Sequence, residues 1–364
     1  MFEHRFIFKG LPSRVVFGAG SLQDLEREVD ALGARRALVL ATPNQEALAQ
    51  EVSTRLHDRS AGVYAHAIMH VPIESVTRAM EETRRRGADC LIAAGGGSTI
   101  GLAKAIALES GLPILAIPTT YAGSEMTSIY GITEAARKRT GQDPRVLPRT
   151  VIYDVDLTLS LPVSITVTSA MNAIAHAAEG LYAQSSNPVI AMMAEQGIAA
   201  IARAIPALYR SPSELTARSD AQYGAWLCGT VLGNVGMALH HKLCHVLGGS
   251  FNLPHAEVHS VVLPHALAFN INAAPSAMER IAEALGVGYA PTGMFDLATR
   301  HGAPAGLKDI GMREADLDLA ADLVVSQPYW NPRPIDAEQR DEIRAVLQRA
   351  YDGTRPQPLG TATL

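Results

Sequence analysis

Short apolar runs alternate with longer amphipathic stretches through the first part of the chain. Residues 37–40, 90–94 and 113–117 are apolar runs of strand length, each followed by apolar positions at helical spacing or by a turn, and residues 151–154 form the last such run. Strands that alternate with helices are typical of βαβ units. The pattern therefore predicts an α/β domain with a mostly parallel sheet over residues 1–158.

The pattern changes after residue 158. From about residue 164 to residue 351, apolar positions recur at helical spacing, and Gly, Pro and Asn residues separate the segments. This predicts an all-helical second domain over residues 159–352. Residues 353–364, rich in Pro, Thr and Gly, predict a flexible tail.

Composition narrows the class of protein. A length of 364 residues suits two domains, and a formal net charge of −5 offers no general basic surface for nucleic acid. The three cysteines are too scattered for a disulfide framework, which favours a reducing compartment. The sequence carries neither the pattern of a signal peptide nor an uninterrupted apolar run of about 18 residues. We therefore expect a cytoplasmic protein that spans no membrane.

Two turns at the ends of predicted strands carry the expected nucleotide-binding residues. Three glycines follow one strand and open a helix, where backbone N–H groups can approach a pyrophosphate without interference from a Cβ atom. Small hydroxyl residues after the next strand can hydrogen-bond an amide or a ribose. Turn formation would also explain each motif alone, but their pairing at one sheet edge favours a dinucleotide site. The expected cofactor-binding residues are Gly95, Gly96, Gly97, Ser98, Thr119, Thr120, Ser124 and Thr127.

Histidines crowd into the second domain. Asn172 and His176 are four residues apart in a predicted helix, as are His241 and His245, so each pair shares a helix face. His255 follows after a Gly-Gly break that could turn the chain back. Imidazoles that converge from facing helices suit a metal site or a proton-transfer site, and the spacing leaves both open.

A single histidine is more often a hydrogen-bonded core or surface residue than a ligand. Five of the 12 histidines lie between residues 240 and 259, and this crowding weakens that interpretation for the group. We expect His259 and His265 to be mainly structural.

These motifs resemble the iron-containing alcohol dehydrogenase family across nearly the whole chain. The resemblance implies a fold like that of dehydroquinate synthase and the iron-containing alcohol dehydrogenases: a dinucleotide-binding α/β domain, an all-helical domain, and an active site in the cleft between them. The matching motifs are GGGS with Lys104, Pro118-Thr119-Thr120 with Ser124-Glu125, Asn172, His176-Ala177 and Glu179, His241 and His245, Leu247-Gly248-Gly249, Phe251, Pro254-His255 and Leu263-Pro264-His265.

The resemblance also shows two departures. Family members that use a metal hold it by one Asp and three His, and these positions correspond here to Asn172, His176, His241 and His255. Because Asn is neutral and binds a hard divalent cation weakly, we expect no catalytic metal; if an ion binds, the three histidines would hold it. Gly101 replaces an Asp that is common in the family.

The departures resemble the maleylacetate reductase branch of that family, as do Tyr121 in a shortened loop and the run at residues 240–245. That branch implies NAD(P)H-dependent reduction of the carbon–carbon double bond of maleylacetate to 3-oxoadipate, in bacterial degradation of aromatic compounds. NADH is the first expectation. Residues 41–44 lack the acidic side chain that would repel a 2′-phosphate, so NADPH is a plausible second cofactor.

The resemblance implies roles for the clustered residues. His241 and His245 would donate a proton or stabilise an enolate, His176 and His255 would orient substrate and donor, and Asn172 would act as a hydrogen-bonding spacer.

The substrate would be a small dicarboxylate, for which Lys242 and Tyr121 are candidate partners, and a homodimer is expected from the family. Other functions stay open. One is a metal-dependent alcohol or polyol dehydrogenase of the same fold, and another is a lyase of similar architecture. A non-catalytic nucleotide-binding protein is the alternative from a different class.

Overall fold

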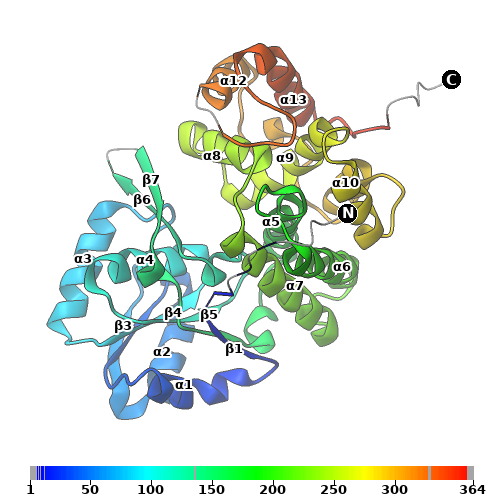
Figure 1. Cartoon of the computed structure of the whole chain (residues 1–364). Coiled ribbons are helices and arrows are strands. Elements are labelled where there is room, and N and C mark those ends of the chain that lie inside the picture. Colours follow the sequence, from blue (N-terminus) through cyan, green and yellow to red (C-terminus); the bar gives the residue numbers. More distant parts are fainter. Residues whose placement is uncertain are drawn as a thin grey trace. The chain divides into compact units, whose positions relative to one another are not determined.

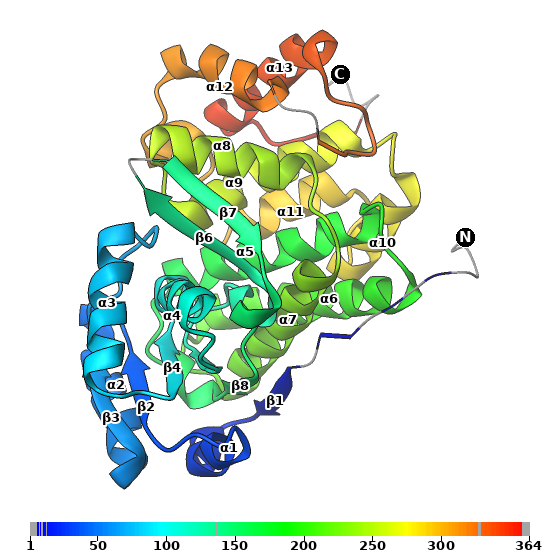
Figure 2. The same ribbon diagram turned by 60° about the vertical axis from the view of Figure 1, so that its left-hand side comes forward.

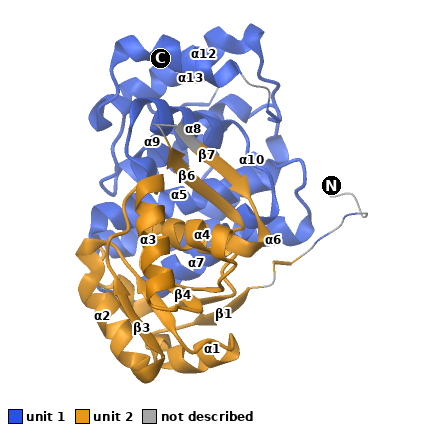
Figure 3. Cartoon of the chain, turned by 90° about the vertical axis from the view of Figure 1, so that its left-hand side faces the viewer, with its two compact units in different colours: residues 1–9, 162–364 blue, residues 10–161 orange. Residues whose placement is uncertain are grey.

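The computed structural model describes residues 6, 8, 10–11, 13–134, 137–326 and 329–358. The chain divides into two compact units, Gly10–Leu161 and Pro162–Leu364 with Met1–Lys9 (Figure 3). Of the predicted tail, residues 354–358 form no helix or strand, and residues 359–364 lie outside the described part.

A six-stranded sheet forms the centre of the first unit. Its strands are β1 (Arg14–Phe17), β2 (Ala37–Leu40), β3 (Ser60–Tyr64), β4 (Cys90–Gly95), β5 (Ile114–Pro118) and β8 (Thr150–Tyr153). They lie in the order β1-β8-β5-β4-β2-β3, and each neighbouring pair is parallel. The predicted parallel α/β architecture is confirmed.

Helices cover both faces of this sheet (Figure 1). The helices α1 (Leu25–Ala31) and α2 (Glu46–Arg55) share one apolar core with Val39, and α3 (Ile73–Arg85) and α4 (Gly97–Ser110) share the other with Leu38. Successive strand residues point to opposite faces, so a strand covered on both sides needs an uninterrupted apolar run.

A hairpin follows the fifth strand and is separate from the main sheet. Its antiparallel strands are β6 (Ile129–Glu134) and β7 (Arg137–Gln142), which Figure 2 shows as two long adjacent arrows. The β7 sequence is polar and charged and β6 holds no continuous apolar run, so apolar runs alone do not predict this hairpin.

The described residues of the second unit form helices joined by loops, with no strand among them, as predicted. The helices are α5 (Val163–Tyr182), α6 (Pro188–Arg210), α7 (Leu215–Asn234), α8 (Leu239–Phe251), α9 (His255–Asn270), α10 (Pro275–Leu285), α11 (Ala290–Thr299), α12 (Leu317–Val325) and α13 (Arg340–Asp352).

Two glycines let α6 and α7 approach closely. A Cβ atom on Gly197 would lie 2.7 Å from Sγ of Cys228, and one on Gly224 would lie 2.8 Å from the carbonyl oxygen of Gly197. Within the described residues, α6 is also the helix long and apolar enough to cross a membrane, but half of its apolar stretch is buried inside the structure. A mostly buried core helix passes the same test of length and composition.

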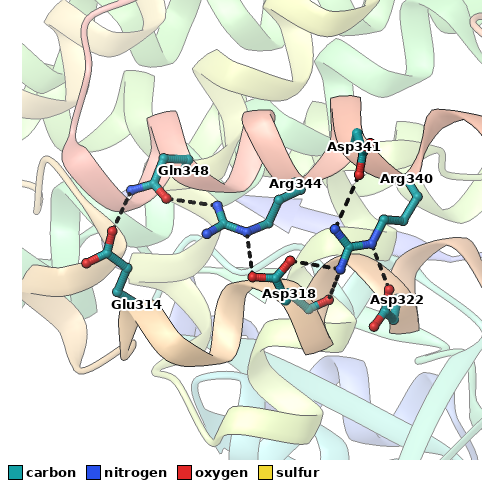
Figure 4. A network of polar contacts seen from close by, with 7 residues as sticks. All are labelled: Glu314, Asp318, Asp322, Arg340, Asp341, Arg344 and Gln348. Atoms are coloured by element: carbon teal, nitrogen blue, oxygen red, sulfur yellow. Dashed lines mark hydrogen bonds and ion pairs between the residues drawn. The ribbon is translucent and has the colours of Figure 1, made fainter.

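Charged side chains join α12 to α13 (Figure 4). The Arg340 guanidinium donates to carboxylate oxygens of Asp318 and Asp322, each at 2.8 Å, and Arg344 donates to Asp318 at 3.3 Å. Both aspartate side chains are exposed and the arginines are partly exposed, so salt screens their attraction and the network contributes modestly.

Candidate active site

The glycine turn lies between β4 and α4. Gly95 has a φ of 154°, and a Cβ atom there would lie 2.5 Å from side-chain oxygens of both Gln45 and Thr99. Gly96 precedes the helix, where a Cβ atom would lie 3.0 Å from the Thr120 side chain. A side chain at either position would fill the space at the helix N-terminus, so the glycines keep that end of α4 open to a phosphate.

The hydroxyl-rich loop lies beside this turn because β5 pairs with β4. Gly95 pairs with Pro118, and the Gln45 side-chain amide donates to the Thr119 hydroxyl at 2.6 Å. The structure thus brings the glycine turn and the start of the 119–127 loop to one edge of the sheet. Tyr121, in this loop, is fully buried.

A buried lysine holds the rest of the loop. Lys104 Nζ donates to the Ser124 carbonyl at 2.6 Å, the Thr127 hydroxyl at 2.8 Å and the Ile129 carbonyl at 2.8 Å. Burial lowers the pKa of Lys104 to about 7, and the nearby Glu125 carboxylate acts in the opposite direction. Lys104 therefore ties α4 to the loop and to the start of β6.

A buried carboxyl group supports the same loop. Glu125 is fully buried and accepts a hydrogen bond from the Tyr153 hydroxyl at 2.8 Å. Burial raises the pKa of Glu125 and raises that of Tyr153 well above its usual value.

The histidine cluster is built by three helices of the second unit. Asn172, His176 and Glu179 come from α5, and the histidines come also from α8 and α9. The ring centroids of His176 and His241 are 5.1 Å apart, and those of His241 and His259 are 5.0 Å apart. Asn172 is also buried, in the same α5 segment.

His245 and His255 occupy the exposed edge of this cluster. The ring of His245 lies 6.2 Å from that of His241, and the ring of His255 lies 4.3 Å from that of His259. The predicted residues of the second unit thus gather in one place, with His176 and His241 inside and the other two histidines toward solvent.

Glu179 organises the buried rings. Its carboxylate accepts hydrogen bonds from the backbone N–H groups of Ala238 at 2.9 Å and His240 at 2.7 Å, and its Oε2 lies 2.7 Å from His241 Nδ1. With the proton of this last pair on the imidazole, Nδ1 of His241 donates to the carboxylate and Nε2 carries a lone pair.

His240 is oriented by a different contact. Its Nε2 lies 3.1 Å from the carbonyl oxygen of His259, and because a carbonyl only accepts, this nitrogen carries the proton. Its Nδ1 faces His241 Nδ1 at 3.4 Å. Both ring nitrogens of His240 thus face neighbouring residues, so His240 helps to position them.

Burial keeps these imidazoles neutral. It lowers the pKa of His240 to about 3 and lowers those of His176, His241 and His259 well below the usual value, and the neighbouring imidazoles add to the effect. Among the described residues, His176 Nδ1, His241 Nε2 and both ring nitrogens of His259 have no hydrogen-bond partner. Since a buried unpaired nitrogen costs about 1–3 kcal/mol, the cluster is suited to a polar ligand.

A divalent ion in this cluster would be held by imidazole nitrogens. Nitrogens of His240, His241 and His259 lie within 4.8 Å of one another, but both nitrogens of His240 already face other groups. Asn172 is neutral, and the carboxylate of Glu179 is occupied by His241 and two backbone N–H groups. The set therefore lacks an anionic ligand.

Lys242 lies one residue from the cluster and next to an aromatic ring. Its Nζ is 5.4 Å from the centroid of the Tyr329 ring, and it makes no ion pair with a residue that the structure describes. Burial lowers the pKa of Lys242 and raises that of Tyr329. The Tyr329 hydroxyl is buried and lacks a hydrogen-bond partner within the described ranges.

Sequence reasoning gave no function to three of these residues. Glu179 was noted as part of a motif, and His240 and Tyr329 were given no role, while the expectation that His259 is mainly structural stays a prediction. The four-residue spacing of His255 and His259, and the three-residue spacing of His176 and Glu179, were visible signals. No local pattern connects Tyr329 with Lys242.

Comparisons with known proteins agree across both units. A model of the iron-containing alcohol dehydrogenases matches residues 12–155, and a model of the C-terminal part of the Fe-containing alcohol dehydrogenase family matches residues 166–351. A maleylacetate reductase of Burkholderia cepacia is 62% identical, with 96% of this chain and 99% of that protein covered. One from Delftia acidovorans is 58% identical, with 97% and 99% covered. The crystal structure of maleylacetate reductase from Agrobacterium tumefaciens is 50% identical with a TM-score of 0.93, covering 97% of this chain and all of that one.

Proposed function

We propose, from the premise that this chain belongs to the iron-containing alcohol dehydrogenase family, that it reduces the carbon–carbon double bond of maleylacetate to give 3-oxoadipate. Relatives with that activity in their names are at least half identical over nearly their whole length. The observation that carries the proposal is the cluster of neutral imidazoles around Glu179 and His241. These rings can accept a proton and pass it on without the help of a bound metal ion.

The reaction needs a hydride and a proton. A reduced nicotinamide supplies the hydride when bound, and Gly95–Ser98 with the loop at residues 119–127 would hold its nucleotide. Addition of hydride to the alkene carbon β to the ketone moves an electron pair onto the ketone oxygen, which gives an enolate. Protonation of the carbon α to that ketone then completes 3-oxoadipate.

We assign the transfer of the proton to the enolate to histidines of α8. A proton on His241 Nε2 gives an imidazolium that the Glu179 carboxylate stabilises, so this ring can pass a proton to the enolate. The exposed His245, one helical turn away, can exchange protons with water. His176 and His255 orient the substrate, with Asn172 as a hydrogen-bonding neighbour, and no metal takes part.

Lys242 is the candidate partner for a substrate carboxylate. A partly buried ammonium without an anionic partner among the described residues gains most from an incoming carboxylate, and the Tyr329 hydroxyl can donate a hydrogen bond to the same group. Tyr121, whose side chain is fully buried, is a second candidate.

We further propose a cytoplasmic homodimer that uses NADH and accepts NADPH. Light scattering of the purified protein tests the dimer directly.

The experiment mixes purified protein with NADH and maleylacetate, follows the loss of NADH absorbance, and identifies the product. Formation of 3-oxoadipate together with NAD⁺ supports the proposal. A parallel reaction offers NAD⁺ and short-chain diols with added Fe²⁺ or Zn²⁺. Turnover of the diols alone would contradict the proposal.

A metal-dependent alcohol dehydrogenase is the second candidate. The close approach of nitrogens from three buried histidines favours it. Stoichiometric metal in the purified protein, with oxidation of alcohols that depends on it, would establish this function instead.

A further inference from the structure

An open cavity of about 400 Å³ lies at the carboxyl edge of the first unit's sheet. It is lined by Pro43, Tyr64, His66, Ile68 and Arg78. Pro43 follows β2, Tyr64 ends β3, and Arg78 comes from α3. Ligands of open α/β sheets bind at this edge, and the volume is within the range of small-molecule sites.

Backbone contacts hold the cavity in shape. Ala41 N–H donates to the Tyr64 carbonyl at 3.1 Å, and Ala67 N–H donates to the Ala41 carbonyl at 2.9 Å, which extends the pairing beyond both strands. This places the segment that carries His66 beside the residues that follow β2.

A strained turn closes the far wall. His70 and Val71, just after Ile68, have φ values of 66° and 49°, which non-glycine residues rarely adopt. Thr133 stabilises this turn by donating its hydroxyl to the His70 carbonyl at 2.7 Å and its N–H to the Val71 carbonyl at 3.0 Å. The wall at Ile68 is therefore preformed.

The lining combines flat apolar surface with positive charge. The rings of Tyr64 and His66 meet edge to face with centroids 5.1 Å apart, and Pro43 and Ile68 add apolar surface that suits a purine base. Arg78 makes no ion pair within the part of the chain that the structure describes, and the lining residues include no carboxylate. An arginine whose guanidinium is available for new hydrogen bonds, together with a nearby imidazole, can bind a phosphate group.

One short helix connects this cavity to the glycine turn. Pro43 begins the 3₁₀ helix Pro43–Gln45, whose last residue donates to Thr119 and lies over Gly95. A dinucleotide with its pyrophosphate at the N-terminus of α4 can thus reach the cavity with its adenosine half.

We propose that this cavity binds the adenosine half of the cofactor and that Arg78 and His66 bind a 2′-phosphate, so that NADPH is used through a dedicated site. The inference rests on the proposed function for its cofactor, and it adds the residues that recognise the phosphate.

Calorimetric titration with adenosine 2′,5′-bisphosphate and with 5′-AMP tests the proposal without turnover. The chain should bind the bisphosphate more tightly. Arg78→Ala should weaken bisphosphate binding by about tenfold or more and change 5′-AMP binding by less than about twofold. Arg84→Ala, an exposed arginine on the same helix, is the matched control and should change neither.

Turnover with maleylacetate provides the second measurement. Arg78→Ala should lower kcat/KM for NADPH and leave that for NADH unchanged. Equal binding of the two nucleotides by the unmodified chain, or equal losses for both in Arg78→Ala, would overturn the inference. Selective loss of bisphosphate binding in a protein that does not reduce maleylacetate would support the cavity assignment and contradict the proposed function.

Discussion

At the scale of single residues, Glu179 determines which nitrogen of His241 is available for chemistry. Glu179→Gln keeps the shape but places an amide N–H against Nδ1, which favours the tautomer with its proton on Nε2 and removes the charge that stabilises an imidazolium. We expect kcat to fall about tenfold to a hundredfold, with little change in KM for NADH. The exposed Glu279→Gln is the control. An unchanged kcat and pH profile would rule out this role for Glu179.

Gly101 gives a second prediction at this scale. A Cβ atom on this residue would lie 2.8 Å from Cγ2 of Val71, which is held at a positive φ. Gly101→Ala should therefore decrease the free energy of unfolding by about 1–3 kcal/mol, although alanine favours helices. Val71→Gly should restore stability in the double variant, because it relieves the overlap and the backbone strain together. Denaturant unfolding of the four proteins measures the coupling, and additive losses would contradict it.

At the scale of elements, the crossing of α6 and α7 depends on the space at two glycines. Gly224→Ala should lower the free energy of unfolding by about 1–3 kcal/mol, because its Cβ atom would lie 2.6 Å from Ile201 Cγ1. Gly249→Ala, in α8, meets nothing within 4 Å and should be neutral or stabilising by up to about 1 kcal/mol. Thermal unfolding compares the two. Equal effects would mean that helix propensity, rather than packing, decides both sites.

The elements also show what local patterns can predict. Strands such as β2 and β4 were predictable because burial on both faces requires an unbroken apolar run. The hairpin of β6 and β7 was not, since its stability depends on strand pairing and on the contacts of Lys104 and Thr133 with distant segments. In the same way, the spacing of His241 and His245 marked a helix face, whereas the packing of His259 against α8 depends on how three helices meet.

At the scale of the whole molecule, buried histidines couple stability to pH. Those with lowered pKa values are His176, His240, His241, His259 and His265. Between the unfolded pKa of about 6.5 and these lower folded values, the unfolded chain binds more protons. The free energy of unfolding therefore decreases as the pH falls through this window, and the full contribution is present above about pH 6.5.

Two buried carboxyl groups act in the opposite direction. Glu125 and Glu179 have raised pKa values, so the folded state binds their protons more readily and gains stability as the pH falls. Because the histidines outnumber them, urea unfolding at about pH 5 should show lower stability than at about pH 7, by up to about 1.4 kcal/mol per histidine for each pH unit. His265→Gln, outside the proposed site, should reduce this slope. A flat profile would contradict neutral burial of the cluster.

The measurement that tests the central claim most directly is the rate of NADH oxidation with maleylacetate after exhaustive chelation. The neutral cluster around Glu179 and His241 predicts that the chelated enzyme keeps its full rate and that added Fe²⁺ or Zn²⁺ does not increase it. Loss of activity on chelation, restored by either ion, would contradict this account and would show that the histidines hold a catalytic metal without a carboxylate ligand.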